Sequence, residues 1–143
     1  MGLFDKIGSA KIYGSSKFFD EGMHTVEINK VLLNKGHKGT SFIIECTIIT
    51  TTGELKPGTT CAQIQKMDGD KRDLALSTIK QFIQACVGDE VEGYTDAEWK
   101  ALADSVVSDE QPLAGLKMKL ETFLKPTRAG GMFTNHKWLH PVE

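Results

Sequence analysis

The sequence predicts a mainly β fold: a small barrel of five strands with one helix between the third and fourth strands. Five segments of the 143-residue chain show the alternation or the β-branched composition of strands. A sixth segment, Lys71–Val87, has an apolar stripe at helical spacing and ends before Gly88, a residue common just after helices. The strand candidates are Met23–Leu33, Thr40–Ile49, Thr59–Lys66, Gly115–Leu124 and Met132–Leu139.

The first two strands carry the clearest local signals. Apolar positions in the first strand change parity between Ile28 and Val31, which predicts a β-bulge of the kind that bends the strands of small barrels. The second strand alternates, so half of its side chains are expected in the core. Gly53 and Pro57-Gly58 predict the turn into the third strand. The expected core positions of the second strand are Phe42, Ile44, Cys46 and Ile48.

An acidic insertion, residues 89–110, follows the long helix. Thr95 and Glu98 form a capping-box pattern, which predicts a short second helix there. The insertion holds eight acidic residues and one lysine, a net charge of −7, so the rest of the chain carries +5 within a total of −2. Two roles remain open for it: a mimic of nucleic acid that occupies a binding groove, or a packed, solvated helix that faces away.

Two basic loops are the strongest functional signal. The loop of residues 34–39 joins strands one and two, the loop of residues 125–131 joins strands four and five, and neither contains an acid. The element order is that of the OB-fold, in which these two loops flank the ligand groove. Binding of single strands needs cations for phosphates and flat side chains for bases. The candidate nucleic-acid-binding residues are Lys35, His37, Lys38, Phe42, Lys66, Lys117, Lys119, Lys125, Arg128, Phe133 and Trp138.

The aromatic candidates have a second interpretation, because each would also suit the core of the barrel. Trp138 is the favoured stacking residue, since it lies near the end of the chain beside Lys137. A solvated lysine face is likewise the alternative to a phosphate track. The co-location of the two basic loops favours the binding interpretation.

No pattern for catalysis or metal binding is found. The chain lacks Gly-x-Ser-x-Gly, the phosphate-binding Gly-x-x-x-x-Gly-Lys-Ser/Thr and His-Glu-x-x-His. His136 and His140 are four residues apart, but a strand followed by Pro141 does not give them a shared helix face. We therefore expect a protein that is not an enzyme and that has no cofactor and no metal site. A nuclease would need carboxylates or histidines clustered at one cleft.

Length and composition predict one soluble domain spanning residues 1–143, with residues 1–22 as an N-terminal arm. No apolar run approaches the ~18 residues of a membrane span, and no secretory signal is recognisable. Three scattered cysteines predict buried, reduced thiols and a cytoplasmic location. They are Cys46, Cys61 and Cys86.

Much of the chain resembles bacteriophage single-stranded-DNA-binding proteins of the OB-fold type. The resemblance lies in MGLFDKIGSAK, HTVEINKVLLNKGHKGTSFIIE, DLALSTIKQFIQACVG, QPLAGLKMKLET and RAGGMFTNHKW. It implies a phage replication or recombination accessory that binds and protects single-stranded DNA with little sequence preference. The implied setting is the host cytoplasm, with phage or host replication and recombination proteins as partners. The preference for DNA over RNA and the formation of homo-oligomers stay open. The alternative is an OB-fold protein-interaction or structural phage component that does not bind nucleic acid.

Overall fold

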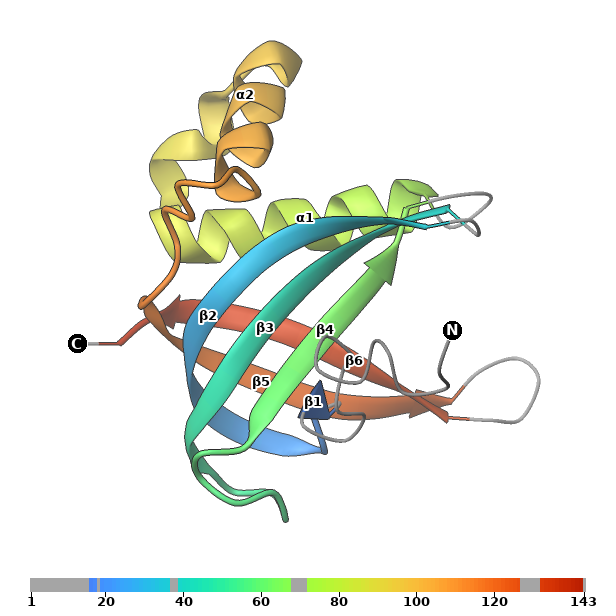
Figure 1. Ribbon diagram of the computed structural model, residues 1–143, viewed down its shortest axis with the longest axis vertical. Helices are drawn as coiled ribbons and strands as arrows, with labels where there is room; N and C mark the ends of the chain where they lie inside the picture. The colour runs from blue at the N-terminus through green and yellow to red at the C-terminus, as the bar shows by residue number, and fades with distance from the viewer. Residues whose placement is uncertain (1–15, 18, 37–38, 68–71, 127–131, 143) are drawn as a thin grey trace, which may run out of the picture.

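The part of the chain that the structure describes is mainly β and contains two α-helices (Figure 1). The computed structural model describes residues 16–17, 19–36, 39–67, 72–126 and 132–142. Each predicted strand overlaps an observed strand, so the mainly β prediction is confirmed. In chain order the elements are β1 (Ser16–Lys17), β2 (Gly22–Gly36), β3 (Gly39–Thr51), β4 (Thr60–Lys66), α1 (Arg72–Val87), the 3-10 helix η3 (Asp89–Gly93), α2 (Asp96–Val106), β5 (Lys117–Pro126) and β6 (Met132–Pro141).

The five long strands form an antiparallel sheet in the order β4-β3-β2-β5-β6, and the short β1 adds a parallel strand beside β4. This sheet is not closed into a barrel, because no backbone ladder joins β4 to β6 among the described residues. Side chains link these two strands instead. The Nε1 of Trp138 on β6 donates a hydrogen bond to Oε1 of Gln63 on β4 at 2.8 Å, and both residues are buried.

β2 bends where the sequence predicts a bulge. Its register against β3 shifts between Ile28 and Lys30, which confirms that prediction. The bend takes β2 away from β5, which pairs with it only as far as Glu27. Beyond this point the side-chain amide of Gln111 continues the ladder, accepting from the N–H of Val31 and donating to its C=O, each at 2.7 Å. Gln111 therefore protects part of an edge that would otherwise be open.

The core lies between the curved sheet and α1. The inward side of β3 contributes Phe42 and Ile44, and α1 contributes Ile79, Phe82 and Ile83. All three cysteines are buried and none forms a disulfide, as predicted. No helix in the described part of the chain is long and apolar enough to cross a membrane.

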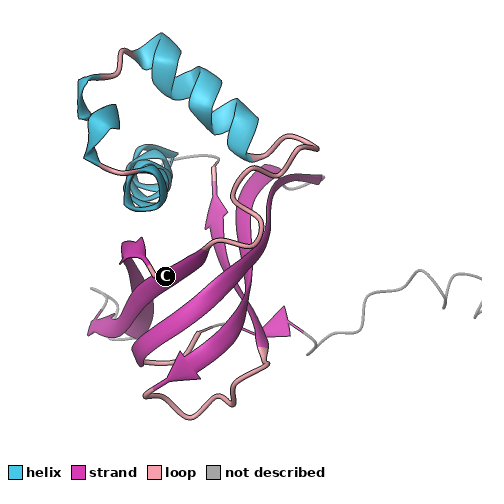
Figure 2. Cartoon of the chain, turned by 90° about the vertical axis from the view of Figure 1, so that its left-hand side faces the viewer, coloured by secondary structure: helices cyan, strands magenta, loops and turns pink. Residues whose placement is uncertain are grey.

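The acidic insertion folds as a packed helix. Thr95 Oγ1 accepts from the N–H of Glu98 at 3.2 Å, and the Glu98 carboxylate accepts from the N–H of Thr95 at 3.1 Å, so the predicted capping box is confirmed. Val106 is buried, and Trp99 packs against the core cluster. Figures 1 and 2 show α2 beyond α1, at one end of the sheet.

Candidate nucleic-acid interface

Two of the aromatic candidates belong to the core. Phe42 is 2 % exposed and Trp138 is 1 % exposed. The Phe82 ring of α1 packs edge-on against both, with ring centroids 6.3 Å from Phe42 and 4.8 Å from Trp138. The prediction that these two rings stack with bases is therefore wrong, because burial leaves no free ring face. The side chain of Phe133 lies outside the described part of the structure.

The structure places Lys35 of β2 and Lys66 of β4 at the same end of the sheet, but on its opposite faces. Lys35 is paired with Thr40 of β3, and Lys66 with the adjacent Ser41. Paired residues share a face and successive residues of a strand alternate between faces, so Lys66 lies on the same face as Ser41, whereas Lys35 lies on the other face, with Thr40. Both side chains are exposed. Three further candidates, His37, Lys38 and Arg128, lie outside the described residues.

Lys117 and Lys119 lie elsewhere, on β5. Lys117 is exposed and stands opposite Glu27. Lys119 is half-buried, and its Nζ donates to Oγ1 of Thr25 at 3.1 Å. Because a carboxylate accompanies these lysines and one ammonium group is already hydrogen-bonded, this region is a weaker anion site than the end of β4. Lys125 is also on β5, but its side chain is not among those described.

An aliphatic row that was not predicted from the sequence crosses the outer face. By outer face we mean the side of β2, β3 and β4 turned away from α1. Cross-strand pairing aligns Leu32 with Ile43 and Ile43 with Ile64. Leu32 and Ile43 are half-buried, whereas Ile64 is 43 % exposed. The sequence contained a signal, because Ile43 alternates with the buried positions of β3 and thus places a β-branched apolar residue on the solvent side.

Lysines stand on both sides of this row. Lys66 lies two residues beyond Ile64 toward the end of the sheet, and Lys30 lies on the other side of the row, opposite Glu45. The Lys30 Nζ is 3.9 Å from the Glu45 carboxylate, and the lysine side chain is 52 % exposed. A solvent-exposed ion pair with such a long N–O distance contributes little to stability, so Lys30 remains able to contact a phosphate. Lys35 and Lys66 form no ion pair with any described residue.

Within the described residues, no group of three or more His, Cys, Asp or Glu side chains is placed to hold a metal ion. No protein-family model matches the chain, and no curated protein matches it. Function has to be inferred from the surface that the fold presents.

Proposed function

We propose that this protein binds single-stranded DNA across the outer face, with little sequence preference and without catalysing a reaction. The observation that carries the proposal is the aliphatic row of Leu32, Ile43 and Ile64 between Lys30 and Lys66. An open sheet face with apolar side chains at its centre and cations at its margins suits a chain of bases linked by phosphates.

The topology supports this assignment. The strand order β4-β3-β2-β5-β6 is that of an OB-fold opened between its third and fifth strands. OB-folds bind oligonucleotides on the face of their second and third strands, which correspond here to β3 and β4. The link between Gln63 and Trp138 lies where a closed barrel would pair these edges. We therefore propose an OB-fold barrel in which side chains replace part of one ladder.

In the proposed mechanism the lysines and the aliphatic side chains have different roles. Lys30 and Lys66 neutralise phosphates and release counterions, which gives affinity that weakens with salt. The aliphatic row contacts the flat faces of bases, and this contact tolerates any sequence because every base has such a face. Duplex DNA keeps its bases stacked inside the helix, so only unpaired strands use both contacts.

The biological setting is part of the same proposal. The resemblance of the sequence to phage single-stranded-DNA-binding proteins supports a replication or recombination accessory acting in the host cytoplasm. Phage or host proteins of the same processes would be its partners. No step of this role requires the protein to make or break a covalent bond.

Protein binding through the same face is a second candidate function. The exposure of Ile64 favours it, because an apolar side chain on an open sheet also suits a protein partner. The two functions differ in their response to charge. Binding of nucleic acid depends on the lysines around the row, whereas an apolar protein contact depends mainly on Ile64 itself.

Reversing the charge of Lys66 tests the proposed function. We expect Lys66→Glu to weaken oligo-dT binding by about tenfold, because it removes one phosphate contact and adds repulsion. Lys56→Glu makes the same charge change on an exposed lysine near the opposite end of β4 and is expected to weaken binding by no more than about twofold. Fluorescence anisotropy of labelled oligo-dT measures both. Equal losses in the two variants would show that only overall charge matters and would contradict a site on the outer face.

A further inference from the structure

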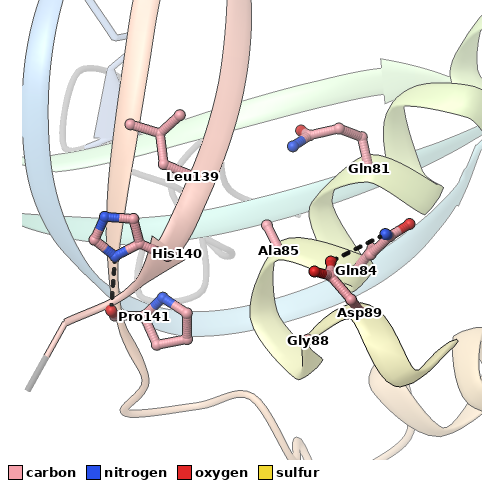
Figure 3. A pocket seen from close by; sticks show the side chains of 8 residues that line it. All are labelled: Gln81, Gln84, Ala85, Gly88, Asp89, Leu139, His140 and Pro141. Atoms are coloured by element: carbon pink, nitrogen blue, oxygen red, sulfur yellow. Dashed lines mark hydrogen bonds between the residues drawn. The ribbon is translucent and has the colours of Figure 1, made fainter. Parts of the chain in front are cut away.

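A cavity of about 430 Å³ lies between the C-terminal half of α1 and the end of β6 (Figure 3). Its upper boundary is a clamp: Gln81 Oε1 accepts from the N–H of Trp138 at 3.2 Å, and Gln81 Nε2 donates to the Trp138 C=O at 2.5 Å. Beyond these two hydrogen bonds, no further one joins the described residues of the helix and the strand. The cavity is lined by Gln81, Gln84, Ala85, Gly88, Asp89, Leu139, His140 and Pro141.

The lining has an apolar wall and an acidic end. Ala85, Leu139 and Pro141 supply the apolar wall. Gly88 ends α1 with φ of 98°, a conformation that favours glycine, and this turn brings Asp89 to the cavity. The acidic end is therefore a consequence of how the helix terminates.

Two carboxylates share a single neutral donor beside the cavity. Gln84 Nε2 donates to Asp89 Oδ1 at 3.4 Å and to Glu92 Oε1 at 3.1 Å. Neither carboxylate forms an ion pair with a described residue. Two like charges held near one amide group repel each other, and a cation placed there would relieve this repulsion.

We propose that this cavity binds an alkylammonium or alkylguanidinium group, the chemistry shared by free polyamines and by lysine or arginine side chains of a protein. The methylene stem would lie along Ala85, Leu139 and Pro141, and the charged head would meet the Asp89 carboxylate. Burying a stem on an apolar wall while the head meets an anion is the usual behaviour of such groups. The site is separate from the outer face and does not depend on the DNA-binding proposal.

The negative charge beside the cavity disfavours anionic ligands. Asp89, Glu90 and Glu92 all belong to η3, and they make a phosphate or nucleotide unfavourable here. Inorganic cations are also poorly matched, because the described residues bring no third ligating side chain to these carboxylates. An organic cation uses both the acidic end and the apolar wall.

Calorimetric titration at low salt tests the site, with spermidine and an acetylated arginine tripeptide as separate probes. We expect at least one probe to bind the full-length protein. Asp89→Asn is expected to weaken that binding by about tenfold or more, because it removes a charge-assisted hydrogen bond. Ala85→Leu should also weaken it, because the larger side chain occupies the cavity. Binding of spermidine alone identifies a free polyamine as the ligand, and binding of the peptide alone identifies a protein side chain.

The matched control is Asp109→Asn, which makes the same charge change on an exposed residue outside the cavity lining. We expect it to alter binding by no more than about twofold. Failure of both probes to bind, or equal losses in the two aspartate variants, would overturn the proposal. Oligo-dT affinity should be the same in Asp89→Asn and Asp109→Asn, so a failure here is distinguishable from a failure of the DNA-binding proposal.

Discussion

Replacing Trp138 by alanine is expected to lower the free energy of unfolding by about 3–5 kcal/mol, because it removes a large, fully buried ring and leaves a cavity. The loss has a polar part as well. Without the indole N–H, the buried Oε1 of Gln63 loses its hydrogen-bond partner. Urea denaturation of the variant and the wild type measures the change.

Two comparisons separate core packing from a role in DNA binding. Lys137→Ala changes the exposed neighbour of Trp138 and should alter stability by less than about 0.5 kcal/mol. Trp138→Phe keeps an aromatic ring but not the indole N–H, so its free energy of unfolding should lie between those of the wild type and Trp138→Ala. If Trp138→Ala were as stable as the wild type and bound oligo-dT more weakly, Trp138 would be a stacking residue after all.

Acidification is expected to destabilise the protein through His136. Burial lowers the pKa of His136 to about 4, and the nearby His24 adds to the lowering. The unfolded chain, with an ordinary pKa of 6.5, therefore binds the proton more readily than the folded protein. This contribution to stability is complete above pH 6.5 and is lost as the pH falls toward 4. At about 1.4 kcal/mol per pKa unit, the loss amounts to about 3 kcal/mol.

His136→Gln supplies the control, because glutamine does not titrate. The free energy of unfolding of each protein is measured by urea denaturation from neutral pH down to about pH 4. Its dependence on pH should be steeper for the wild type than for the variant. The wild type should lose more stability over this range than the variant does, by the amount that His136 contributes. Identical pH dependences would show that His136 is not buried in its neutral form. Local geometry supports burial, since the Phe19 ring packs edge-on against the His136 ring at 5.8 Å.

Local patterns predicted the elements of this fold well. Alternation, glycines and the capping box lie within short stretches of chain, so they located the strands, the bulge after Ile28 and the helix that Thr95 caps. The open seam between β4 and β6 was not predicted. It depends on contacts between distant residues, such as Gln63 with Trp138, that no local pattern encodes.

The same limit explains the errors at the candidate site. Trp138 looked accessible because it is near the chain end and follows Lys137, but α1 covers it through Phe82 and Gln81. Ile64 was not predicted as a base contact because aromatic side chains are the usual platforms for bases. In the folded sheet, its pairing with Ile43 brings aliphatic side chains together on the outer face.

Titration of oligo-dT at about 50 mM and about 200 mM salt, beside a duplex of the same length, tests the central claim most directly. Each phosphate neutralised on a single strand contributes about −0.7 to the slope of log affinity against log salt, so contacts from Lys30 and Lys66 predict a slope of about −1.4 or steeper. The single strand should bind more tightly than the duplex at both salt concentrations. Affinity that does not change with salt, or that is equal for single strand and duplex, would contradict binding of single-stranded DNA on the outer face.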